Sequence, residues 1–98
     1  MFLAGRNRTA AVTCIEVALM RHGNANYNLV LAKLHSLYNC DIEDCINRLE
    51  YLRAVLKEVY RQDYHSILED ITSELGTLEV LEITDFKSEF CKFMTSLL

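Results

Sequence analysis

Two histidines and two cysteines are the first side chains in this sequence that could do chemistry, because imidazole and thiolate are the ligands that zinc prefers. Cys40 and Cys45 are close in sequence to His35, and helix packing could bring His65 near them. The spacing His-x4-Cys-x4-Cys lacks the Cys-x2-Cys pair that makes zinc signatures specific. We therefore keep a zinc-stabilised domain as an alternative and predict no bound metal and no cofactor.

Catalysis has little support in the sequence. Cys40 and Cys45 lie among Asp41, Glu43 and Asp44, whose negative charge raises the pKa of a thiol and so weakens it as a nucleophile. No serine lies in a Gly-x-Ser-x-Gly turn, and no glycine-rich phosphate loop is present. Counted from Asp41, the positions that a calcium loop reserves for glycine and for a bidentate glutamate hold isoleucine and leucine. We predict that the protein is not an enzyme.

Positive charge is concentrated in the first part of the chain. Residues 1–39 hold four basic side chains and one acidic one, whereas the remainder holds six and thirteen, so that the net charge is -4. This net charge disfavours nucleic-acid binding by the whole surface, although the asymmetry can steer two copies of the chain together. A nucleic-acid-binding transcriptional regulator that uses the basic N-terminal half is the first alternative function, through Arg6, Arg8, Arg21 and Lys33.

The elements that must position these residues follow from hydrophobic spacing. The chain has 98 residues, no proline and three glycines, so long helices are left uninterrupted. Apolar side chains recur every three or four residues in five segments, which predicts helices over residues 9–22, 27–38, 48–61, 64–75 and 85–97. Asp41 and Asp44 suit the start of a short helical turn between the second and third helices, and residues 77–83 are predicted to be a connector.

These segments predict an all-α fold, a compact bundle of four to five helices in one domain that spans residues 1–98. Residues 1–8 are predicted to form a flexible N-terminal arm. The predicted core draws on the apolar stripes of all five helices: Ile15, Leu19, Val30, Leu34, Leu52, Leu56, Ile67, Ile71, Phe86 and Phe90.

The last predicted helix carries many bulky apolar side chains for a small chain. Such a face closes the core or, where it stays uncovered, binds another protein or a second copy of the chain. We expect a homodimer or another protein partner, and the candidate interface residues are Phe86, Phe90, Phe93, Met94 and Leu97.

Membrane insertion and export are not expected. The longest apolar runs are far shorter than the ~20 residues that span a bilayer. The first residues place apolar side chains before positive ones, the reverse of a secretory signal peptide. We therefore expect a cytoplasmic protein with free thiols and no membrane partner.

Two segments carry a family resemblance: LYNCDIEDC at residues 37–45 and EYLRAVLKEVY at residues 50–60. They resemble a small helical output domain of ammonia-oxidising archaea, named after Nitrosopumilus, and the resemblance covers about residues 14–76. This chain has Leu49 where the family pattern has proline, and Arg61 where it has glycine. The resemblance implies a regulatory or interaction domain without catalytic residues. Our leading hypothesis is a non-enzymatic helical protein-interaction or output module in signalling or regulation that forms a homodimer.

Overall fold

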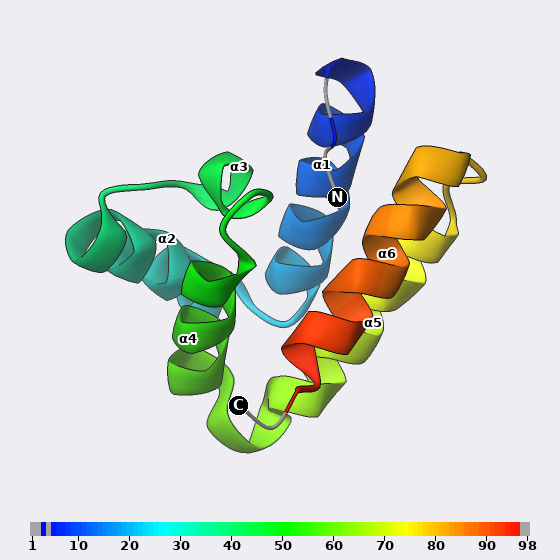
Figure 1. The fold of residues 1–98 in the computed structure, drawn as a ribbon. Coiled ribbons are helices and arrows are strands. Elements are labelled where there is room, and N and C mark those ends of the chain that lie inside the picture. Colours follow the sequence, from blue (N-terminus) through cyan, green and yellow to red (C-terminus); the bar gives the residue numbers. More distant parts are fainter. Residues whose placement is uncertain (1–2, 4, 97–98) are drawn as a thin grey trace.

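The chain folds into helices joined by short connections (Figure 1). The computed structural model describes residues 3 and 5–96, and over these residues no strand occurs. This confirms the predicted all-α bundle. The elements in chain order are α1 (Gly5–Arg21), α2 (Asn24–Tyr38), the single-turn α3 (Ile42–Cys45), α4 (Leu49–Tyr60), a 3-10 turn (Arg61–Asp63), α5 (Tyr64–Gly76) and α6 (Leu81–Met94).

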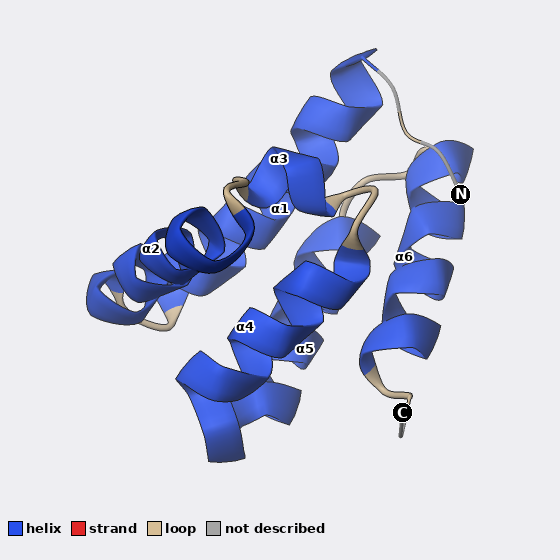
Figure 2. Cartoon of the chain, turned by 60° about the vertical axis from the view of Figure 1, so that its left-hand side comes forward, coloured by secondary structure: helices blue, strands red, loops and turns tan. Residues whose placement is uncertain are grey.

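Three helices form the centre of the bundle. α1 packs against α5, and α4 contacts α5 as well as α2, α3 and α6. α2 lies against α1 and α4 on one side, whereas α6 runs antiparallel to α5 on the other, so that α2 and α6 occupy opposite sides of the molecule (Figures 1 and 2). The short connection between α5 and α6 requires this antiparallel arrangement.

The core is where the apolar stripes predict it. All ten predicted core residues are buried, and among the other described residues with polar or charged side chains only tyrosines and cysteines are buried. Fully burying an aliphatic or aromatic side chain of this size contributes roughly 1.5–3 kcal/mol. The stripes therefore account for most of the driving force that holds the helices together.

The start of the chain corrects one prediction. α1 begins at Gly5, so residues 5–8 are helical and do not form a flexible arm, and Leu3 is fully buried. The Arg8 guanidinium donates a hydrogen bond of 2.8 Å to the carbonyl oxygen of Glu43, which ties the first turn of α1 to α3. This contact joins residues far apart in sequence, so local periodicity could not reveal it.

Local signals set other helix ends. The Asp41 carboxylate accepts a 3.0 Å hydrogen bond from the Asp44 backbone N–H, and the Asp44 carboxylate accepts one of 3.1 Å from the Asp41 N–H. This reciprocal capping box confirms the predicted short helix. Asn39 ends α2 in the left-handed conformation (φ 52°), and Gly23 lies between α1 and α2 with φ 116°. Both residue types tolerate positive φ better than most.

Candidate functional site

The structure corrects the predicted interface on the last helix. Phe86, Phe90 and Met94 are at most 1% exposed and belong to the core of their own bundle. Phe93 is half-buried, with the Arg53 guanidinium 4.1 Å from its ring centroid. Leu97 lies outside the described residues. α6 needs its apolar face to cover α4 and α5, so this face is not free to bind a partner.

The four candidate metal ligands do not converge. The sulfur atoms of Cys40 and Cys45 are 3.8 Å apart, but His35 on α2 and His65 on α5 are both exposed. Over residues 3 and 5–96, no group of three or more histidine, cysteine, aspartate or glutamate side chains is placed to hold a metal ion. A tetrahedral zinc site needs about four such ligands, which this arrangement does not supply.

The Cys45 thiol is held in its protonated form. Burial raises its pKa well above the ordinary range, and Cys40, Asp44 and Asp41 raise it further. The sequence argument from the neighbouring acids therefore gave the right direction for Cys45, although burial is the larger cause. A thiol that stays protonated is a poor nucleophile and a poor metal ligand.

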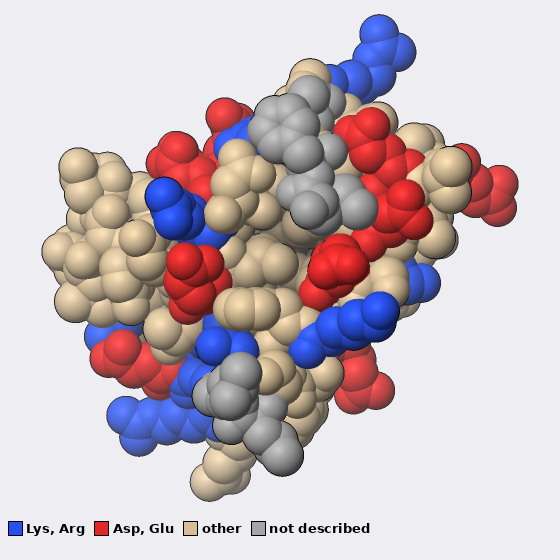
Figure 3. Space-filling model, viewed as in Figure 1, with Lys and Arg blue, Asp and Glu red and all other residues tan. Residues whose placement is uncertain are grey.

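The candidate nucleic-acid residues do not form one basic surface. The Arg21 guanidinium lies 2.6 Å from the Glu74 carboxylate, and the Lys33 ammonium lies 2.8 Å from that of Glu58. Arg8 contacts Glu43, and Arg6 is exposed at the start of α1. Acidic and basic side chains are interspersed on the face shown in Figure 3. A nucleic acid would meet carboxylates beside three of the four cations.

The outer side of α2 is an exposed surface without charged groups. Lys33 is the only Lys, Arg, Asp or Glu of the helix, and it pairs with Glu58 on α4. Opposite the buried Val30 and Leu34, a stripe of exposed residues at three- and four-residue spacing runs along the helix. We call this the α2 outer face; it consists of Ala25, Asn28, Leu29, Ala32 and Ser36.

Exposed leucines make this region apolar. Leu29 is 43% exposed within the face, and Leu37 is 57% exposed outside it, one turn beyond Lys33. In Figure 3, the left-hand edge of the molecule, where α2 lies, is largely free of Lys, Arg, Asp and Glu. Sequence reasoning missed this surface because α2 has the spacing of an ordinary core helix, and its lack of charge on the far side was the available signal.

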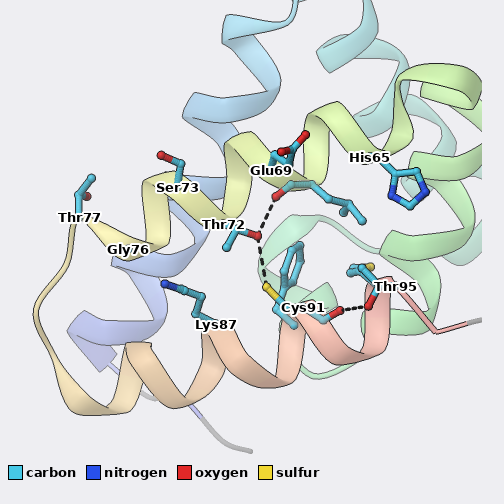
Figure 4. A pocket seen from close by; sticks show the side chains of 12 residues that line it. His65, Glu69, Thr72, Ser73, Gly76, Thr77, Lys87, Cys91 and Thr95 are labelled. Carbon is cyan, nitrogen blue, oxygen red and sulfur yellow. Dashed lines mark hydrogen bonds between the residues drawn. The ribbon is translucent and has the colours of Figure 1, made fainter.

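A groove of about 660 Å³ lies between α5 and α6 (Figure 4). On α5, its lining recurs every three or four residues from His65 to Gly76. On α6, the lining recurs in the same way from Lys87 to Thr95. At a rise of 1.5 Å per residue the groove extends along about 16 Å of α5. We call this cavity the α5–α6 groove.

Small side chains account for the groove. Thr72 of α5 faces Cys91 of α6, and Gly76 faces Lys87, so the two helices leave space between them where larger residues would fill it. The Thr72 hydroxyl lies 3.4 Å from the Cys91 sulfur at the middle of the groove (Figure 4). The floor is apolar and is formed by the buried Leu68, Phe90 and Met94.

One positive charge lies at the end of the groove near the α5–α6 connection. The Lys87 ammonium lies beside Gly76, 3.4 Å from the position that a Cβ atom would occupy there. Figure 4 shows Lys87 extending from α6 towards Gly76, with His65 and Thr95 at the opposite end. The small residues at positions 72, 76 and 91 indicate this cavity in the sequence. They predict it only once α5 and α6 are known to pack against each other.

Comparison with models of known protein families, with curated proteins and with solved structures found no match for this chain. Among the described residues, no helix combines the length and apolar character needed to cross a membrane.

Proposed function

We propose that this protein is a non-enzymatic protein-interaction module of signalling or regulation that forms a homodimer through the α2 outer face. The observation that carries the proposal is the 43% exposure of Leu29 on the α2 outer face, which contains no Lys, Arg, Asp or Glu. The resemblance of residues 37–45 and 50–60 to an archaeal output domain supports a role in signalling or regulation.

Charge favours a second copy as the occupant of this face. A two-fold interface brings each surface patch against the same patch of the partner, so a charged patch would repel itself. With a net charge of -4, two copies repel each other over much of their surface. The α2 outer face, which has no Lys, Arg, Asp or Glu, avoids this repulsion, and burying Leu29 supplies favourable free energy.

The test compares two leucine-to-glutamate variants by light scattering after size exclusion over a range of concentrations. Leu29→Glu places a carboxylate on the α2 outer face, whereas Leu81→Glu makes the same change at a residue that is 78% exposed at the start of α6. Wild-type protein and Leu81→Glu should shift from the 11.3 kDa monomer to a dimer as concentration rises. Leu29→Glu should stay monomeric with unchanged helical circular dichroism.

The expected weakening follows from the leucine. Losing the burial of one Leu29 side chain costs roughly 1.5–3 kcal/mol, and each 1.4 kcal/mol corresponds to about a tenfold change in the dissociation constant. Two symmetry-related glutamates would add repulsion. A wild-type protein that stays monomeric at every concentration, or a Leu81→Glu variant that dissociates as readily as Leu29→Glu, would overturn the proposal.

A further inference from the structure

The α5–α6 groove has the size and chemistry of a small-molecule site. Its volume of about 660 Å³ lies within the range of roughly 300–1,000 Å³ that is typical of ligand pockets. Its floor of Leu68, Phe90 and Met94 is apolar and suits an apolar ligand body. The groove follows α5 over about three turns and α6 over about two, and this shape favours an elongated molecule.

The three threonine hydroxyl groups of the groove already have partners. Thr72, Thr77 and Thr95 each donate a 2.7 Å hydrogen bond to a carbonyl oxygen of their own helix, those of Leu68, Glu74 and Cys91 respectively. The threonine donors are therefore used by the backbone, and in Figure 4 the Ser73 hydroxyl points away from α6, so the middle of the groove has no donor directed at a ligand between the helices. The polar group of a ligand must therefore be recognised at an end.

Lys87 supplies that recognition. Its ammonium carries three N–H donors, and no carboxylate or carbonyl of the described residues forms an ion pair or hydrogen bond with it. Glu69 is the one acidic residue among the described lining residues; it is exposed, and in Figure 4 its carboxylate points away from α6. Glu69 also lies about 10 Å along α5 from Gly76, where the ammonium sits. The Lys87 end of the groove is therefore the place for an anion.

We propose that the α5–α6 groove binds a small amphipathic carboxylate. The apolar body lies between α5 and α6 on Leu68, Phe90 and Met94, and the carboxylate accepts hydrogen bonds from the Lys87 ammonium. α2 lies on the opposite side of the molecule, so this binding is independent of self-association through the α2 outer face (Figures 1 and 2).

The experiment is isothermal titration calorimetry with dodecanoate below its micelle concentration. Dodecanol, which has the same tail and no charge, and acetate, which has the carboxylate and no long tail, are the ligand controls. Dodecanoate should bind with a stoichiometry of one per chain and more tightly than dodecanol, and acetate should give no measurable heat of binding. Loss of the charge-assisted bond in Lys87→Met should weaken dodecanoate binding about tenfold, or about 1.4 kcal/mol.

Matched variants separate the groove from the rest of the surface. Lys92→Met makes the same change at an exposed lysine of α6 outside the lining and should bind as wild type does. Ser73→Phe places a ring at the rim and should block binding, whereas Ser66→Phe, at an exposed α5 position outside the lining, should not. Leu29→Glu should bind dodecanoate normally, so this test and the dimer test fail independently.

Three outcomes would overturn the proposal. They are no dodecanoate binding by the folded wild-type protein, equal affinity for dodecanoate and dodecanol, and equal weakening by Lys87→Met and Lys92→Met. Circular dichroism checks that each variant is folded. If Ser73→Phe does not fold, the comparison of the two lysine variants still decides the question.

Discussion

Two buried tyrosines offer a matched test of how buried hydroxyl groups contribute to the free energy of unfolding of this bundle. Tyr60 is 5% exposed and Tyr64 is 7% exposed. The Tyr64 hydroxyl donates a 2.7 Å hydrogen bond to the carbonyl oxygen of Met94, the last residue of α6. The final carbonyls of a helix have no partner within it, so Tyr64 caps α6 from a distant part of the chain. The Tyr60 hydroxyl is buried without a hydrogen-bond partner among the described residues.

Replacing each tyrosine by phenylalanine should therefore have different effects. Tyr64→Phe removes a hydrogen bond worth about 0.5–1.5 kcal/mol and leaves its carbonyl acceptor unpaired, so the free energy of unfolding should fall by about 1–2 kcal/mol. Tyr60→Phe removes a buried hydroxyl that has no partner, so the free energy of unfolding should stay the same or rise by up to about 1 kcal/mol. In a domain of this size each 1 kcal/mol moves the melting temperature by roughly 4–8 °C.

Urea unfolding followed by far-UV circular dichroism measures both differences. The slope of the free energy against urea concentration should be the same for all variants, because the surface exposed on unfolding does not change. Tyr51→Phe is the control substitution. The Tyr51 side chain is half-buried, and its ring stacks on that of Tyr38 with the ring centroids 4.3 Å apart. A Tyr60→Phe variant as destabilised as Tyr64→Phe would refute the reasoning.

Two further predictions follow from the core and its titratable groups. Phe90→Ala, at a fully buried position, should lower the free energy of unfolding by about 3–5 kcal/mol, measured by urea unfolding. Light scattering should show the same oligomeric state as the wild-type protein. A variant that is as stable as the wild type but no longer dimerises would show that α6 is an interface after all. Burial raises the pKa of Cys14, Cys45, Tyr60 and Tyr64 in the folded protein. Above the ordinary thiol pKa of 9.0, the unfolded chain loses protons that these groups keep in the folded protein. Their contribution to the free energy of unfolding is therefore complete at neutral pH and declines as the pH rises above 9.0. Thermal unfolding at a series of pH values measures this decline. Constant stability up to pH values near the ordinary tyrosine pKa of 10.0 would count against the thiol contribution.

The charge asymmetry of the chain illustrates how tertiary structure changes the meaning of a sequence feature. In the sequence it indicated steering between two copies or attraction of nucleic acid. In the fold, α1 packs on α5 and α2 packs on α4, so Arg21 meets Glu74 and Lys33 meets Glu58. Exposed ion pairs of this kind contribute only about 0–1 kcal/mol each, but they remove free positive charge from the surface.

The sequence by itself determined the all-α class, the central parts of the five long helices and the ten predicted core residues. These features depend on apolar side chains that recur at the helical period, which is a local property of the chain. The capping box of Asp41 and Asp44 could also be predicted from the sequence, because its two residues lie in one helical turn.

Tertiary structure alone decided which surfaces remained available. Phe86, Phe90 and Met94 have the same sequence pattern whether α6 covers its own bundle or a partner, and the packing of α6 on α5 settles that they are core. The α5–α6 groove needs small residues from two helices to face each other, and the first turn of α1 is joined to α3 by a hydrogen bond between Arg8 and Glu43. Each of these features depends on pairs of residues that only the packing of the helices brings together.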